Sequence, residues 1–75
     1  GVTDAIRPSA MINIIGRHPQ TADILAIPET HLHLYGKAER PGRKLGHITV
    51  TAANYQALQR RIAEIAHCLP NKMAL

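Results

Sequence analysis

The spacing of the apolar residues changes at Thr51, and this change restricts the fold more than any other feature of the sequence. Before it, segments 31–35 and 45–51 alternate between apolar and polar residues, which is typical of half-buried β-strands. After it, apolar residues recur every three or four positions, which predicts an amphipathic helix that Thr51 caps and Pro70 ends. The apolar side of this helix consists of Tyr55, Leu58, Ile62, Ile65 and Leu69.

Two further segments precede the alternating pair. The run "SAMINIIG", residues 9–16, is short and rich in isoleucine, so we expect a largely buried strand in which Asn13 hydrogen-bonds neighbouring backbone. Residues 17–30 are expected to form a connector with a short helix, capped by Thr21 and ended by Pro28. The fold class is therefore α+β: a small, antiparallel, β-rich domain with one C-terminal amphipathic helix.

The segments 31–35 and 45–51 are close enough in sequence to pair as an antiparallel hairpin. Pro41 and Gly42 suit the central positions of a type II turn between them, because proline presets the first backbone angle and glycine accepts the positive second one. Gly36 and Gly46 flank the connection and allow β-bulges.

Composition limits the size and setting of the domain. The chain has 75 residues, no Phe or Trp and two Tyr, so we expect one domain with a thin core that a neighbouring domain completes. The first residue is glycine, and we expect a fragment of a longer protein. One cysteine, Cys68, cannot form an internal disulfide, and no apolar run approaches the ~20 residues of a membrane span, so a cytoplasmic protein is expected.

The connection between the paired strands is strongly basic. Around one acid, Glu39, it carries Lys37, Arg40, Arg43 and Lys44, and the whole chain has a net charge of +4. Cations on both sides of a stiff turn can converge on one anion, and a phosphate monoester suits both a lysine ammonium and an arginine fork. The alternative is a hairpin tip whose charges are simply solvated.

Other chemistry finds little support in the sequence. A zinc site built on His31, His33 and His47 would need a fourth ligand or water, and strand histidines are more often packed or hydrogen-bonded. Cys68 is expected to be a small core residue, and the acids are too scattered to form a carboxylate pair or a magnesium site. By itself the domain lacks the parts of an enzyme.

The runs "SAMINIIG" and "HLHLYGKAERPGRKLGHITV", with the closing helix, resemble the C-terminal domain of carboxyaminoimidazole ribonucleotide synthetases over nearly the whole chain. The resemblance implies an ATP-grasp ligase of purine biosynthesis, homodimeric, that uses ATP to carboxylate aminoimidazole ribonucleotide with bicarbonate. It places ATP, magnesium and most catalytic groups on upstream biotin-carboxylase-like and ATP-binding domains. Residues 1–75 would then be the C-terminal domain alone, and we expect them to be inactive.

The same resemblance assigns two site residues. In this family the lysine of "YGK" and the arginine after "PG" contact the phosphate of the ribonucleotide, and these map onto Lys37 and Arg43. It also implies a fold that is the remnant of a barrel-sandwich hybrid with a helix.

Two other functions stay open at this level. A small nucleic-acid-binding module fits the charge, although stacking aromatics, a helix-turn-helix pattern and zinc-finger spacing are missing from the sequence. A pure packing or dimerisation domain would be favoured if the loop cations formed salt bridges with Glu39 or Asp23.

Overall fold

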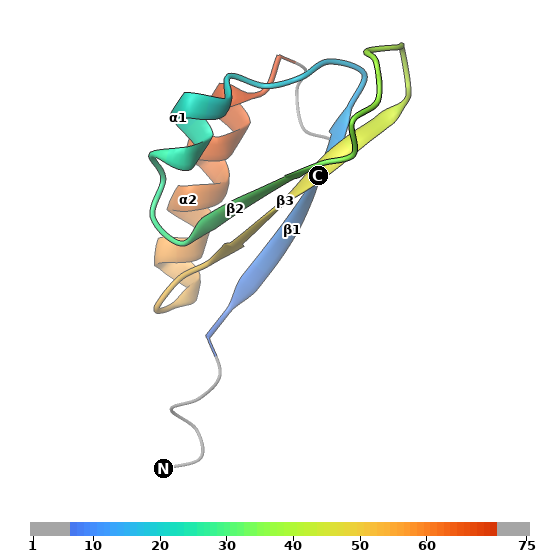
Figure 1. Cartoon of the computed structure of the whole chain (residues 1–75). Helices are drawn as coiled ribbons and strands as arrows, with labels where there is room; N and C mark the ends of the chain where they lie inside the picture. The colour runs from blue at the N-terminus through green and yellow to red at the C-terminus, as the bar shows by residue number, and fades with distance from the viewer. Residues whose placement is uncertain (1–6, 71–75) are drawn as a thin grey trace.

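The computed structural model describes residues 7–70 of the chain (Figure 1). Its elements follow in the order β1 (Ser9–Ile15), α1 (Thr21–Leu25), β2 (Thr30–Leu34), β3 (Lys44–Thr51) and α2 (Tyr55–Cys68). The described residues therefore combine helices with an antiparallel sheet, and the predicted α+β class is confirmed.

The sheet has three strands in the order β1-β3-β2, with β3 in the centre and antiparallel to both neighbours. The predicted hairpin of β2 and β3 is confirmed, and β1 adds to its other side. In this register Ile48 of β3 lies between Ile12 and Leu32, and His47 lies between Asn13 and His33. Because side chains alternate along a strand, these two rows point to opposite faces of the sheet.

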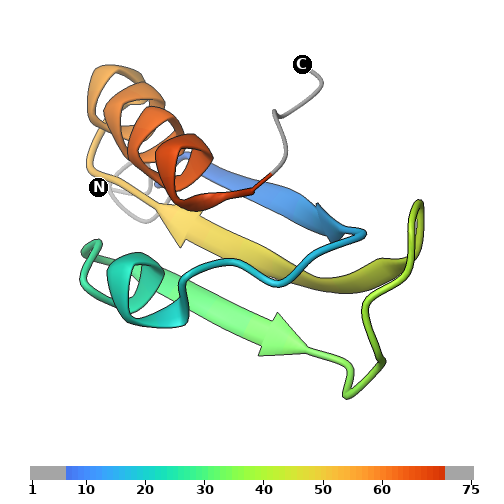
Figure 2. The ribbon, with the colours of Figure 1, turned by 90° about the horizontal axis from the view of Figure 1, so that it is seen from above.

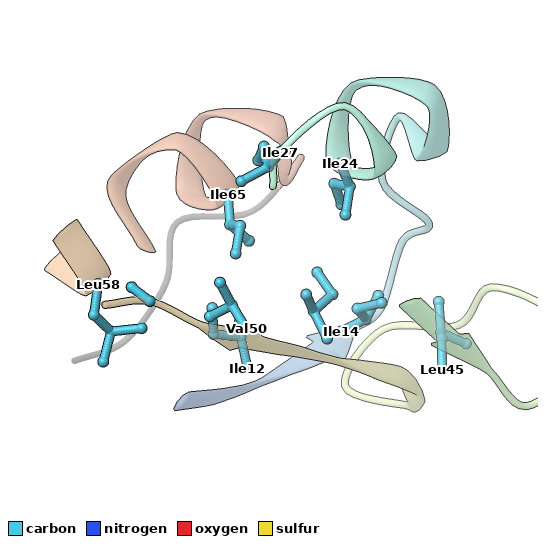
Figure 3. Packing of buried hydrophobic residues seen from close by; sticks show 10 residues of the cluster. Ile12, Ile14, Ile24, Ile27, Leu45, Val50, Leu58 and Ile65 are labelled. Carbon is cyan, nitrogen blue, oxygen red and sulfur yellow. The ribbon is translucent and has the colours of Figure 1, made fainter. Parts of the chain in front are cut away.

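Both helices lie on the same side of the sheet (Figures 1 and 2). The core fills the space between the sheet and the helices, and Figure 3 shows its aliphatic side chains pointing toward one another across that space. The buried members are Ile12, Ile14, Ile24, Ile27, Leu45, Ile48, Val50, Ala52, Leu58 and Ile65. No described element covers the opposite face of the sheet, which we call the open face. The core is thus a single aliphatic layer.

This one-sided core corrects the prediction for residues 9–16. The segment is a strand, as expected, but its burial alternates: Ile12 and Ile14 are buried, whereas Met11, Asn13 and Ile15 are exposed. Asn13 lies in the row of the open face, so its side chain is not a buried amide. The prediction of a largely buried strand is wrong because helices cover only one face of the sheet.

Both predicted helix caps are wrong. The N-cap of α2 is Asn54, whose side-chain oxygen accepts a hydrogen bond of 2.8 Å from the main-chain N–H of Ala57. Thr51 cannot serve, because it is the last residue of β3. In α1, Thr21 is already the first helical residue, and the N-cap position is occupied by Gln20 without a side-chain cap bond.

The apolar side of α2 is narrower than the sequence pattern suggests. Leu58 and Ile65 are buried, Ile62 is half-buried, and Tyr55 is 74% exposed. Leu58 and Ile65 are seven residues apart and so lie nearly in line along the helix, whereas Ile62 and then Tyr55 lie farther round it. Tyr55 therefore does not belong to the core, contrary to expectation.

The turn between β2 and β3 has the predicted geometry. Gly42 has a φ of 76°, and the N–H of Arg43 donates to the carbonyl of Arg40 over 3.0 Å, which closes a type II turn at Pro41 and Gly42. The register between β1 and β3 shifts beside Gly46, where Leu45 is the extra residue, so the predicted bulge is confirmed there. Gly36 lies beyond the end of β2 with a φ of 75°.

Candidate phosphate-binding loop

The basic loop extends past the end of the sheet between β2 and β3 (Figures 1 and 2). We call residues 36–39 its first limb and residues 40–43 its second limb. Lys37 lies on the first limb and Arg43 on the second, so the two residues named from the sequence come from opposite sides of the Pro41-Gly42 turn.

The second limb is fixed to the residue that follows β1. The N–H of Gly16 donates to the carbonyl of Arg43 over 2.8 Å, and the N–H of Arg40 donates to the carbonyl of Gly16 over 3.2 Å. These two main-chain bonds attach both ends of the second limb, Arg40 and Arg43, to Gly16. The limb that carries Arg43 is therefore anchored to the residue that follows β1.

The first limb is fixed by His18. The main-chain N–H of His18 donates to the carboxylate of Glu39 over 2.7 Å, and its ring Nε2 lies 3.2 Å from the carbonyl oxygen of Lys37. A carbonyl only accepts, so the ring nitrogen donates in this second bond. His18 was not predicted from the sequence, because it is 19 and 21 residues away from these partners and carries no local signal of the contact.

The side chain of Arg43 crosses the loop. Its guanidinium donates to the carbonyl of Ala38 over 3.2 Å, and Ala38 directly follows Lys37. Arg43 is half-buried, and a guanidinium has further N–H donors in the same plane that this bond leaves available. The structure thus places the Arg43 head group against the limb that carries Lys37.

Lys37 is exposed, and its ammonium lies 5.8 Å from the centre of the Tyr35 ring, a cation–π arrangement. The Tyr35 hydroxyl is 2.7 Å from Nδ1 of His47, and the His47 ring stacks on His33 with centres 4.5 Å apart and planes 17° apart. On the open face, His47 is therefore stacked and hydrogen-bonded, and His33 is stacked against it. Among residues 7–70, no three His, Cys, Asp or Glu side chains are arranged to hold a metal ion.

Within residues 7–70, the acids near the loop form no salt bridge with its cations. Glu39 is occupied by the main chain of His18, and the ion pairs within residues 7–70 join Arg7 and Arg61 to Glu29. The salt bridges to Glu39 or Asp23 that would favour a pure packing domain are therefore not seen in this part of the chain. An open hollow of about 480 Å³ lies beside the turn, lined by Gly16, Arg17, Glu39, Arg40, Pro41 and Gly42.

Cys68 is the remaining reactive side chain that the sequence singled out. It lies at the end of α2 and packs against the core, as expected. Burial, with smaller contributions from Asp23 and Glu64, raises the pKa of its thiol, so the thiolate is disfavoured. The described helices include none that is long and apolar enough to cross a membrane.

The fold and the loop together define a small α+β domain that presents a hydrogen-bonded, cation-rich loop at one end of its sheet. The chain belongs to the phosphoribosylaminoimidazole carboxylase C-terminal domain family, whose model matches residues 9–61. This result confirms the resemblance found in the sequence.

Relatives with high similarity are N5-carboxyaminoimidazole ribonucleotide synthases. The one from Vibrio cholerae is 47% identical over 72 residues, which are 96% of this chain and 19% of that protein. The crystal structure of the Thermus thermophilus synthetase matches 84% of this chain and 18% of its own, with 44% identity and a TM-score of 0.79. The Aspergillus clavatus synthase, solved with ADP and 5-aminoimidazole ribonucleotide, matches 79% of this chain and 18% of its own, with 45% identity and a TM-score of 0.66. The chain therefore spans about a fifth of the length of these relatives.

Proposed function

We propose that the chain is the C-terminal domain of an ATP-dependent ligase that carboxylates aminoimidazole ribonucleotide with bicarbonate in purine biosynthesis. In that enzyme Lys37 and Arg43 bind the phosphate of the ribonucleotide. The names of the relatives support the reaction, and the Aspergillus clavatus complex supports the substrate. The resemblance of the sequence to this family supports the remaining parts of the proposal. Residues 1–75 form one domain, its fold is the remnant of a barrel-sandwich hybrid, and the full-length enzyme is a cytoplasmic homodimer.

The contact between Arg43 and the first limb is the observation that carries the phosphate assignment. The guanidinium already lies at Ala38, next to Lys37, and the second limb behind it is fixed to Gly16. A phosphate near Ala38 would meet a planar fork from Arg43 and a point charge from Lys37. Such a site binds and orients the substrate without taking part in bond making.

The chemical step belongs to the upstream part of the enzyme in this proposal. ATP supplies the activation of bicarbonate there, and magnesium would neutralise its phosphates. We place both upstream because the acids of this chain are too scattered for a magnesium site, and because the Aspergillus clavatus relatives solved with ADP and with ATP are about five times longer than the matched segment. The role left to this domain is to hold the far end of the ribonucleotide while its amine reacts.

The test uses the full-length ligase. A hydrogen bond to a charged group contributes about 1.5 to 3 kcal/mol, so Arg43→Ala should weaken ribonucleotide binding roughly ten- to a hundredfold. Lys37→Ala should act in the same direction, and the double variant should lose less than the sum, because both cations bind one anion. Titration calorimetry with aminoimidazole ribonucleotide measures these affinities, and ATP affinity should stay unchanged.

Two variants control for charge alone. Arg40→Ala removes a cation from the same loop, and Arg60→Ala removes one from the exposed side of α2. Both should leave ribonucleotide affinity close to that of the parent. Equal losses for Arg40→Ala and Arg43→Ala, both abolished by salt, would instead mean a diffuse basic patch.

A further inference from the structure

We infer that His18 is a positioning residue for the phosphate site, which it serves by holding the main chain of the limb that bears Lys37. The inference rests on the proposed function of Lys37 and Arg43 and adds a residue that lies outside the basic loop. It also predicts which chemical group at position 18 the site requires, namely a side-chain N–H.

The hydrogen bonds of the first limb show why His18 matters. Within residues 7–70, limb 36–39 makes three: the carbonyl of Ala38 accepts from Arg43, while His18 donates to the carbonyl of Lys37 and to the carboxylate of Glu39. The limb is not part of a strand, since β2 ends at Leu34 and β3 begins at Lys44. Two of its three attachments therefore come from one residue.

The position of Lys37 depends on these attachments. Gly36, just before it, has a φ of 75°, and a Cβ built there would meet no atom within 4 Å beyond its chain neighbours, so nothing packs against that side of the glycine. Arg43 is also a proposed ligand of the phosphate, so in a bound state its donors are shared between the Ala38 carbonyl and the phosphate. The two His18 bonds involve no proposed phosphate ligand group and hold the limb independently of the Arg43 guanidinium.

The contact with Lys37 restricts the protonation state of the His18 ring. Nε2 must carry a proton to donate to the Lys37 carbonyl, and Nδ1 is buried without a hydrogen-bond partner in the described structure. The form that holds the limb is therefore one with a proton on Nε2, and nitrogen chemical shifts of the ring report it directly.

The affinity experiment compares three variants of the full-length ligase by titration calorimetry, with aminoimidazole ribonucleotide as the probe. His18→Leu removes the ring donor, and His18→Gln restores an amide N–H at similar reach. His31→Leu is the matched control, because His31 is exposed on β2. We expect His18→Leu to weaken binding of the probe about three- to tenfold, which corresponds to the loss of one ordinary hydrogen bond. The affinities of His18→Gln and His31→Leu should stay close to that of the parent.

Lys37→Ala distinguishes the proposed phosphate contact of Lys37 from the positioning role of His18. If it leaves the affinity unchanged, the proposed phosphate contact of Lys37 fails. If Lys37→Ala weakens binding of the probe while His18→Leu does not, the phosphate contact of Lys37 is supported and the positioning role of His18 is overturned.

Amide shifts of residues 37–39 test the inference without any ligand. They should move in His18→Leu, return in His18→Gln and stay in place in His31→Leu. Unchanged shifts in His18→Leu, or a parent His18 ring protonated on Nδ1 instead of Nε2, would overturn the inference. If His18→Leu does not fold, the parent ring tautomer and the His18→Gln rescue still decide it.

Discussion

Glu29 is a single residue at which three parts of the chain meet. Its carboxylate accepts hydrogen bonds from Arg7, at 2.6 and 2.8 Å, and from the Thr51 hydroxyl, at 2.8 Å, and lies 3.3 Å from the Arg61 guanidinium. Its φ of 57° lies in the left-handed region that non-glycine residues rarely adopt. Contacts with the segment before β1, the end of β3 and α2 hold this conformation.

The same contacts make stability depend on pH. The Thr51 hydroxyl first, and then Arg7, lower the pKa of Glu29 from its usual 4.5. A carboxyl with a lowered pKa in the folded state stabilises the fold above its unfolded pKa, and this contribution is lost as pH falls through the folded value. Glu29→Gln should therefore melt lower than the parent near pH 7, and the difference should shrink below about pH 4.

Thermal melts between about pH 3 and about pH 7 measure this difference. Glu64→Gln, on the exposed side of α2, is the matched control for the loss of one carboxylate. A Glu29→Gln difference that is the same at every pH would mean that the contacts of Glu29 act through shape and not through charge.

At the scale of elements, the pairing of β2 with β3 requires a residue without a Cβ at position 46. A Cβ on Gly46 would overlap the carbonyl oxygen of His33 and lie 3.1 Å from its carbon. Both atoms are backbone of the neighbouring strand, so they cannot move without separating the strands. The glycine that permits the bulge also permits this close approach.

Gly46→Ala should accordingly destabilise the domain more than Gly36→Ala. At Gly36 an added Cβ meets no atom within 4 Å, and the cost is that of its φ of 75°, about 1 to 2 kcal/mol. Urea unfolding of both variants and the parent gives the comparison. Equal destabilisation would show that the strands adjust to the added carbon.

The packing of α2 yields the third prediction. Ile65 is fully buried, so Ile65→Ala should cost about 2 to 5 kcal/mol, while half-buried Ile62→Ala should fall at or below the lower end of that range. Tyr55→Ala should change stability by less than about 0.5 kcal/mol, because the ring is exposed. A melt of Ile65→Ala that overlays the parent would contradict the packing of α2 on the sheet.

At the scale of the whole molecule, the domain is a single layer of helices on one face of a sheet. Its open face carries the stacked His33 and His47 together with Tyr35, and the loop with Lys37 lies at the end of the same strands. These features suit a domain that contributes one wall of a site, with the rest supplied by the upstream part of the proposed ligase.

The fourth prediction follows because this domain is proposed to supply only one wall of the site. The purified 75-residue chain should hydrolyse no ATP and carboxylate nothing when aminoimidazole ribonucleotide and bicarbonate are supplied. A coupled assay of ADP release measures it, with the full-length ligase as the positive control. ATP turnover that the ribonucleotide stimulates would contradict the assignment of the chemistry to the upstream domains.

Local sequence patterns determined the types of the elements. The change of apolar period at Thr51 predicted the hairpin and α2, and the Pro41-Gly42 pair predicted the turn that presents Lys37 and Arg43 on opposite limbs. These features depend on residues a few positions apart, whose backbone preferences act within one turn or strand. They could be found without knowing where the rest of the chain lies.

Only the tertiary structure decided which surfaces are covered and which distant groups meet. Asn13 is exposed because the helices lie on one face of the sheet, and Thr51 is no helix cap because β3 extends through it. His18 reaches Lys37 and Glu39 across 19 and 21 residues, and Glu29 reaches Thr51 across 22. No local preference encodes such contacts, because they form only after the order of strands β1-β3-β2 brings the segments together.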